Sequence, residues 1–501
     1  MRRAAPVLPT WRLRTGVISI IVLLVVGLTP RTAVAAASAV TVPCSGPNGG
    51  EPGLVAAIDA ANSAGGGARI VLAAGCTYTL THNFDVPDGG GLPAITTNLL
   101  IGAPDPSSPA TIVRASSAPP FSILNVDAPG ALTLANVTVA GGLAVDGFAG
   151  GGIGVASGAS LHLVGSRVTA NTAIGQNEVA AEGGGIYSRG DVTVDQSRVD
   201  HNLATNNAPG QLAVGGGIGN EATDAARPAT LTVRNSSIDH NRVSAPNGNS
   251  PGAVGAGVAT LGVARATITR SDVTENRAEA GGINGAALGG GLFDNLSFFT
   301  GQADTATDVE GGRLTGNTVS AHGGGFGAGA AVYDGTGDKT TIAETNISDN
   351  RATADGNAAT AAGGAIYEEP ATTLVVVDET VIARNSATAS GDTSQALGGA
   401  LANSGDATLG DAHLTRNSTS GSGAGSIARG GGVWTSTTTA TGDELHLART
   451  TIDYNRATAG PGAAAGGGLY LDQGTVTITA AAAIRRNIPD NCAPTNSVAG
   501  C

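Results

Sequence analysis

A short phrase that recurs along the chain sets the predicted architecture: an aliphatic residue, two variable residues and an asparagine. Examples are Val199-Asp-His-Asn202 and Ile347-Ser-Asp-Asn350, and successive asparagines lie 31 to 41 residues apart. Self-similarity at such a period is typical of solenoids, in which each repeat stacks on the next. The asparagines are Asn171, Asn202, Asn241, Asn276, Asn317, Asn350, Asn385, Asn417, Asn455 and Asn487.

Two further segments complete each repeat. One is a glycine run followed by an aliphatic residue, as in Gly183-Gly-Gly-Ile186. The other is a short alternating segment such as Val192-Thr-Val194, whose period of two and β-branched residues indicate a half-buried strand. Three short strands per repeat predict an all-β protein, a right-handed parallel β-helix solenoid of about ten or more coils.

The regular spacing of the repeats predicts where the turns and linkers lie. We expect each asparagine to adopt a positive φ in a tight turn and to stack on the asparagine of the next coil. The segments between an asparagine and the next glycine run, such as 172–182 and 203–214, vary in length. They are predicted to be surface loops along one side of the coils, either tolerated insertions or a binding face.

The N-terminal end of a β-helix needs a cover, because open strand edges invite aggregation. Leu54, Ala57, Ile58 and Ala61 recur at helical spacing before a glycine run. We therefore predict a short N-terminal capping helix over residues 51–63.

The four cysteines, Cys44, Cys76, Cys492 and Cys501, lie as two pairs near the two ends of the repeats. Four cysteines allow three pairings, and proximity in sequence favours Cys44–Cys76 and Cys492–Cys501. The predicted organisation is a signal peptide, an N-terminal cap with the first coils, the β-helix repeats and a C-terminal disulfide cap. These parts cover 1–39, 40–130, 131–487 and 488–501.

The first 39 residues have the pattern of a secretory signal peptide. Arginines such as Arg12 and Arg14 precede an apolar run over 17–28, and small residues follow at Ala33-Val-Ala35. The alternative is a membrane anchor, but the run is shorter than the roughly 20 residues of a spanning helix. We expect a secreted, extracellular protein, free or associated with the cell surface, with no membrane span after cleavage.

The charge balance narrows the class of partner. Because five arginines and no acids precede residue 40, the remainder has 21 basic and 39 acidic residues, a formal net charge of −18. Such acidity disfavours nucleic acid and anionic membranes. A polysaccharide or another cell-surface ligand is the expected partner, and a monomer is the expected state.

The repeat resembles that of polymorphic outer membrane proteins, which pairs Gly-Gly-Ala-Ile with Phe-x-x-Asn. Gly363-Gly-Ala-Ile366 matches the first motif, whereas an aliphatic residue replaces the phenylalanine of the second. The resemblance covers residues 40–501 and implies the pectate-lyase-like superfamily, which includes polysaccharide lyases, hydrolases and adhesins. Polymorphic outer membrane proteins also carry an autotransporter barrel, for which residues 488–501 are too few.

Motifs for catalysis or cofactor binding are absent from the sequence: it has no metalloprotease, nucleophile-elbow or phosphate-loop signature. We therefore expect no catalytic residue and no cofactor. The candidates for a cation or acid–base site are Asp200, His201, Asp239 and His240, which occupy matching places in adjacent repeats and should stack. The alternative is that these are exposed positions that tolerate any residue.

Three functions fit these observations. The first is an exported non-catalytic β-helix that serves as an adhesion or binding module. A polysaccharide-active lyase or hydrolase is the second, supported by analogy of fold alone. The third is a structural rod in an envelope or matrix.

Overall fold

The computed structural model falls into two units, Met1–Ala37 and Ser38–Cys501, and the description below concerns the second. The predicted signal peptide lies outside the described residues except for Ala39. No helix among the described residues is long and apolar enough to cross a membrane. The described residues are 39–85, 89–145, 150–176, 179–295, 305–437, 443–479 and 481–501.

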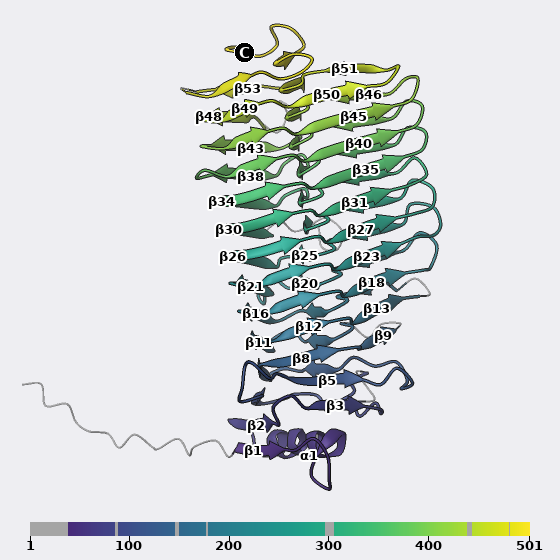
Figure 1. The fold of residues 1–501 in the computed structure, drawn as a ribbon, viewed down its shortest axis with the longest axis vertical. Coiled ribbons are helices and arrows are strands. Elements are labelled where there is room, and N and C mark those ends of the chain that lie inside the picture. Colours follow the sequence, from purple (N-terminus) through teal and green to yellow (C-terminus); the bar gives the residue numbers. More distant parts are fainter. Residues whose placement is uncertain are drawn as a thin grey trace, which may run out of the picture. The chain divides into compact units, whose positions relative to one another are not determined.

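The chain forms a solenoid in which coils stack along one axis (Figure 1). One coil consists of β16 (Asp191–Asp195), β17 (Arg198–Asp200), β18 (Leu203–Asn206), β19 (Leu212–Val214) and β20 (Ile218–Ala222). Each of these strands pairs in parallel with its counterpart in the next coil. The prediction of an all-β protein with parallel sheets is confirmed, although this coil has five strands rather than three.

The first strands of each coil, two separate strands or one continuous strand of 10 residues, belong to one sheet of 24 strands, here called the bend sheet. Valine, leucine and isoleucine alternate with polar residues along its strands, as Val192 and Val194 do in β16, and both valines are buried. These side chains fill the main hydrophobic core. The other strands of the bend sheet are β1 (Ala39–Val42), β2 (Ala68–Leu72), β3 (Thr77–Leu80), β4 (Asn98–Gly102), β5 (Ala110–Arg114), β7 (Ala131–Ala135), β8 (Val137–Ala140), β11 (Ser160–Val164), β12 (Arg167–Thr169), β21 (Thr230–Arg234), β22 (Ser237–Asp239), β26 (Arg265–Thr274), β30 (Ala306–Thr315), β34 (Lys339–Ser348), β38 (Thr373–Val377), β39 (Val381–Ala383), β43 (Asp406–Gly410), β44 (His413–Thr415), β48 (Leu445–Ala448), β49 (Thr451–Asp453), β53 (Val476–Ile478) and β54 (Ala483–Arg485).

The strands that follow the glycine runs form a sheet of 12, the glycine sheet. Its aliphatic residues, such as Ile186 and Ile218, are fully buried and close the main core opposite the bend sheet. The remaining strands of the glycine sheet are β6 (Leu124–Val126), β10 (Ile153–Val155), β15 (Ile186–Ser188), β25 (Val258–Gly262), β29 (Leu292–Asn295), β33 (Val332–Asp334), β37 (Ile366–Glu368), β42 (Leu401–Asn403), β47 (Val433–Ser436), β52 (Leu469–Gln473) and β55 (Cys492–Ala493).

The linkers predicted as surface loops form two further sheets for much of their length, so that prediction was wrong. The sheet of ten that follows the asparagines is the asparagine sheet, and the sheet of nine after it is the alanine sheet. The other strands of the asparagine sheet are β9 (Leu143–Val145), β13 (Thr172–Gly175), β23 (Arg242–Ala245), β27 (Arg277–Ala280), β31 (Thr318–Ala321), β35 (Arg351–Asp355), β40 (Ser386–Ser390), β45 (Ser418–Ser422) and β50 (Arg456–Ala459). Those of the alanine sheet are β14 (Ala181–Glu182), β24 (Gly252–Val254), β28 (Ala286–Leu288), β32 (Phe326–Ala328), β36 (Thr360–Ala362), β41 (Gln395–Leu397), β46 (Ile427–Arg429) and β51 (Ala463–Ala465).

Small side chains explain why these two sheets pack together. Ala204 of the asparagine sheet and Ala213 of the alanine sheet are fully buried in a second core made almost entirely of alanine. At Gly327 the approach is close, because an added Cβ would lie 2.4 Å from the backbone oxygen of Thr353. Alanine has a low β-propensity, so an alternation of alanine with polar residues gives little strand signal in the sequence.

The asparagines of the repeat form a buried hydrogen-bond ladder. The backbone N–H and Nδ2 of Asn202 donate to Oδ1 of Asn241 at 3.1 and 3.0 Å, and Nδ2 also donates to the carbonyl of Val168 at 3.0 Å. The positive φ lies instead one residue earlier, at 55° in both His201 and His240, so that part of the prediction was wrong. The residue before each asparagine makes the turn, and the asparagine side chain satisfies backbone groups inside the coil.

At the N-terminal end the helix predicted over 51–63 is present as α1 (Gly50–Ser63) and contacts β1, β2 and β3 (Figure 1). Leu54 and Ile58 are fully buried. The carboxylate of Glu51 accepts hydrogen bonds from the backbone N–H of Thr81 at 2.8 Å and from that of His82 at 3.0 Å. Burial opposes ionisation of Glu51, but these bonds lower its pKa below the usual value.

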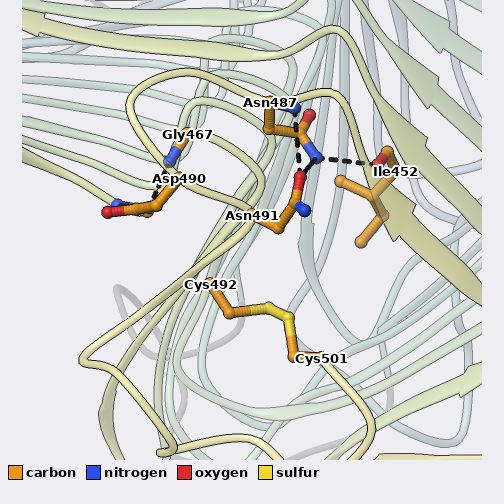
Figure 2. Close-up of a disulfide and its surroundings, with 8 residues drawn as sticks. Ile452, Gly467, Asn487, Asp490, Asn491, Cys492 and Cys501 are labelled. Carbon is orange, nitrogen blue, oxygen red and sulfur yellow. Dashed lines mark hydrogen bonds between the residues drawn. A yellow bond between two sulfur atoms is a disulfide. The ribbon is translucent and has the colours of Figure 1, made fainter.

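The C-terminal end closes the asparagine ladder within one turn of chain (Figure 2). Oδ1 of Asn491 accepts from the backbone N–H of Asn487 at 3.1 Å, in the place that the next coil's asparagine would take. Asp490 accepts from the N–H of Gly466 at 2.7 Å and of Gly467 at 3.2 Å. The disulfides are Cys44–Cys76 and Cys492–Cys501, the pairing that sequence proximity favours.

Candidate binding surface along the bend sheet

In the coils from β16 to β43 the chain bends within the bend sheet, either between two strands or inside one continuous strand, and each bend contains a residue with a positive φ. The values are 48° at Gln196, 49° at Asn235, 45° at Arg270 and 50° at Glu344, and these four side chains are exposed. Except at Gly311, which has no side chain, the bend therefore displays a side chain in each of these coils. We call this series the bend row: Gln196, Asn235, Arg270, Gly311, Glu344, Asp378 and Asp411.

A second ladder of hydrogen bonds, formed by serine side chains, lies behind the N-terminal half of the bend row. The backbone N–H of Ser166 donates to Oγ of Ser197 at 3.0 Å, that of Ser197 to Ser236 at 3.0 Å, and that of Ser236 to Ser271 at 3.1 Å. These serines are buried directly behind the turn. Sequence reasoning missed them, although a serine stands two residues before the aliphatic residue of the recurring phrase in each of these repeats.

The N-terminal half of the bend row borders a hollow of about 630 Å³. Its lining combines amide, hydroxyl and guanidinium groups, which are hydrogen-bond donors and acceptors suited to an oxygen-rich ligand. Arg270 donates to Oδ1 of Asn235 at 3.3 Å, and both side chains are exposed. The lining residues include Gln196, Asn235 and Arg270, the serines of the ladder up to Ser236, and Arg167 and Arg198.

Arg167 and Arg198 connect this hollow to the residues that the sequence singled out. Nε of Arg167 donates to Oδ1 of Asp200 at 2.7 Å, and Nε of Arg198 donates to Oδ1 of Asp239 at 2.9 Å, each across to the next coil. The Asp200 side chain is fully buried beneath arginines that remain 44% exposed. Burial opposes its ionisation, but the bonds from Arg167 and His201 lower the pKa of Asp200 below the usual value.

The two histidines stack, as their matching places in the repeats predicted. The ring centroids of His201 and His240 lie 4.9 Å apart with an interplanar angle of 2°. Nδ1 of each ring lies 2.8 Å from the aspartate before it, Asp200 or Asp239, and Nε2 of His240 lies 2.5 Å from Glu275. The two aspartates are thus held by arginine and histidine in a network of ion pairs. Within the described ranges, no three His, Cys, Asp or Glu side chains form a group that could hold a metal ion.

The C-terminal half of the bend row borders a second hollow, of about 710 Å³, and is acidic. Glu344, Asp378 and Glu379 are exposed, and Asp411 accepts a hydrogen bond from Nε of Arg449 at 2.6 Å. The bend row therefore changes along its length from amide and arginine side chains to carboxylates. The lining residues of this hollow are Glu344, Thr345, Asn346, Asp378, Glu379, Val381 and Asp411.

An aromatic column on the glycine sheet was also missed by sequence reasoning. Six of the chain's 15 aromatic residues occupy one register position, directly after the aliphatic residue that follows the glycine run. Neighbouring rings in the middle stack, with centroids 5.2 Å apart for Phe293 and Tyr333. The column packs against the alanine sheet in a third apolar cluster. Its members are Tyr187, Phe293, Tyr333, Tyr367, Trp434 and Tyr470.

A pair of glutamates surrounds the first member of this column. The hydroxyl of Tyr187 donates to Glu221 and accepts from Nε of Arg189, the latter at 2.9 Å. Burial and the neighbouring charge of Glu221 raise the pKa of Glu182 to about 7. A carboxyl group that titrates near neutral pH beside a second carboxylate has the chemistry of a general acid or base.

Four other acids lie inside the main core, away from the bend row: Asp294, Asp334, Asp338 and Glu368. Three of them occupy the third position after the glycine run, where serine, asparagine or threonine stands in most of the other repeats and Val155 and Leu471 stand in two. The sequence thus carries a signal for them, a polar residue at an inward position.

Comparisons with protein-family models, with curated proteins and with solved structures find no match for this chain.

Proposed function

We propose that this protein is an exported, non-catalytic binding module that holds a polysaccharide or another cell-surface ligand along the bend row. The observation that carries the proposal is the series of polar side chains at the bends of successive coils, interrupted only at Gly311 within the bend row and flanked by two hollows. Amide, guanidinium and carboxylate groups match the hydroxyl groups of a glycan as hydrogen-bond partners.

The spacing of the bend row favours an extended ligand. Parallel strands lie about 4.8 Å apart, so a chain that runs along the solenoid meets a new polar side chain at each coil of the bend row except that of Gly311. The net charge of −18 disfavours polyanions over most of the surface. A neutral polysaccharide is therefore the preferred ligand class, bound by a monomer.

Four finer features are also proposed: the handedness of the coils, the capping role of α1, the superfamily and secretion. We infer a right-handed parallel β-helix of ten or more coils, because parallel crossovers are right-handed in nearly all proteins. The buried face of α1 supports a capping role over the first strands. The repeat of the polymorphic outer membrane protein type supports the pectate-lyase-like superfamily, and the leader pattern of residues 1–39 supports secretion.

The test is depletion of the chain 40–501 onto a panel of insoluble polysaccharides. The double variant Gln196→Ala/Arg270→Ala should bind at least tenfold more weakly, because it removes two exposed partners without touching the core. The matched control is Gln395→Ala/Arg351→Ala, which removes the same side-chain types from the alanine and asparagine sheets. Equal loss of binding in both double variants, or binding that neither changes, would refute a site on the bend row.

A second candidate function, glycan cleavage, is favoured by one observation, the Glu182–Tyr187–Glu221 cluster. Glycosidases use two carboxyl groups, one of which has a raised pKa. Mass spectrometry of the same incubations tests this candidate. Shortened sugars that disappear with Glu182→Gln would establish catalysis, whereas bound but intact glycans would support the binding module.

A further inference from the structure

Acidic side chains line the inside of three consecutive coils. Asp294, Asp334 and Glu368 occupy the same register position in β29, β33 and β37. They are 1%, 0% and 0% exposed, and Asp338, in the turn after β33, is 3% exposed. Parallel pairing places neighbours about 4.8 Å apart along this series. We call these four residues the interior acid column.

Few groups are available to bond these carboxyl groups. Thr340 Oγ1 lies 3.3 Å from Oδ2 of Asp294, and Thr372 Oγ1 donates to Oε1 of Glu368 at 2.9 Å. Among the described residues, no group makes a hydrogen bond of good geometry to the other side-chain oxygens of the column, including both of Asp334 and both of Asp338, although Thr305 and Thr340 lie close to them.

Within the part of the chain that the structure describes, the elements packed against the column supply no positive charge that acts on its carboxyl groups. Their charged and polar groups that face it are Thr260, Thr305, Thr307, Thr340 and Thr372, with Glu369 near Asp338 and with Asp406 and Asp443 near Glu368. Lys339, the residue after Asp338, is exposed. A buried carboxylate without a cationic partner is strongly destabilising, and such a group takes up a proton instead.

We propose that three members of the interior acid column, Asp334, Asp338 and Glu368, hold their protons in the folded protein at neutral pH, and that the coils from β29 to β37 open when alkaline pH removes them. A protonated carboxyl group donates one hydrogen bond, so neighbours in the column can bond to one another instead of repelling. The solenoid thereby contains a conformational device that responds to rising pH, independent of any ligand on the bend row.

The direction of the pH effect follows from the pKa values. Burial, reinforced in Asp338 by the charge of Asp294, raises the pKa of Asp294 to about 6, of Glu368 to about 8 and of Asp338 to about 9. Burial and neighbouring acids raise the pKa of Asp334 well above its usual value. The folded state then binds more protons than the unfolded state between about pH 4 and pH 9, so stability is fully present below that range and is lost as pH rises through it.

The experiment follows thermal unfolding of the chain 40–501 from pH 5 to pH 9.5. The unfolding equilibrium constant should rise by up to tenfold per pH unit for each carboxyl group that stays protonated only when folded. Hydrogen exchange, corrected for its intrinsic pH dependence, should lose protection in β29, β33 and β37 before other coils. A Tm that is constant or rises over this range would overturn the proposal.

Variants separate the column from the remaining acids. Asp338→Asn and Glu368→Gln should flatten the alkaline decline, whereas Asp349→Asn, at an exposed acid bonded to Arg384, should leave it unchanged. An alkaline decline that is identical in all three variants would contradict the inference. So would restoration of the alkaline Tm by Ca²⁺ in the unsubstituted protein but not in the variants, because a cation would then neutralise the column.

A spectroscopic measurement does not depend on whether the variants fold. The infrared band of protonated carboxyl groups should persist in the unsubstituted protein at pH 7, where exposed acids are ionised, with more intensity than the half-protonated Glu182 alone accounts for. Its absence at pH 7 would overturn the proposal.

Discussion

Asn202 binds Asn241 twice, because its backbone N–H and its side-chain Nδ2 both donate to the same Oδ1, at 3.1 and 3.0 Å. The same two bonds link Asn171 to Asn202, at 3.1 and 3.0 Å. Asn202 therefore accepts two hydrogen bonds from the preceding coil and donates two to the following coil. One asparagine side chain per repeat thus fixes the register in which the coils stack.

Replacement of one member of this ladder should be costly. Asn202→Ala leaves the backbone N–H and Nδ2 of Asn171 without their buried acceptor, and it also removes a donor to Val168. We expect a loss of about 3–5 kcal/mol in unfolding free energy, since each buried unsatisfied group costs roughly 1–3 kcal/mol. Urea denaturation measures the loss. The control is Asn207→Ala, at an exposed side chain, for which a change above about 0.5 kcal/mol would be unexpected.

The buried Asp200 should make the free energy of unfolding fall at acid pH, which gives the pH profile of stability an acid limb. Its lowered pKa means that its contribution is fully present above about pH 4 and is lost as pH falls through the folded value. Asp200→Asn should remove this limb and cost about 2 kcal/mol at pH 7, a figure reduced because Arg167 remains partly solvated. Thermal unfolding between pH 2 and pH 7 follows both effects.

The matched comparison is Asp272→Asn. Asp272 accepts from Nε of Arg313 at 3.1 Å, but both side chains are substantially exposed. Such a surface pair contributes roughly 0.2–1 kcal/mol. An Asp272→Asn effect as large as that of Asp200→Asn would show that burial does not set the strength of these pairs.

The disulfides should differ in their effect because they close loops of different length. Cys44 and Cys76 are 32 residues apart, and Cys492 and Cys501 are 9 apart. The chain-entropy relation gives about 4 kcal/mol for the first and about 3 kcal/mol for the second. Paired Cys→Ser variants and guanidinium denaturation test this order. A larger loss on removal of Cys492–Cys501 would mean that the C-terminal closure, rather than loop entropy, dominates.

The repeat was visible in the sequence because its strands next to the main core are rich in valine, isoleucine and leucine. Spacing alone could not show that the residue before Asn202, rather than Asn202 itself, has the positive φ. It also could not show the arginine partner of Asp200, since Arg167 lies 33 residues earlier and reaches it only through the register of β12 and β17. The stacking of His201 and His240 was predictable because both occupy one repeat position.

The alanine-lined core, by contrast, gave no hydrophobic signal, and its packing can be tested directly. Ala361 is fully buried and pairs with Gly327 on one side and Ala396 on the other. Ala361→Leu should destabilise the protein by about 1–3 kcal/mol, because the extra methylenes must separate two closely packed sheets. Thr353→Leu introduces the same side chain at a half-buried position of β35 and should cost less. If urea denaturation shows equal or smaller losses for Ala361→Leu, the two sheets are not in close contact, and small residues there are needed for another reason.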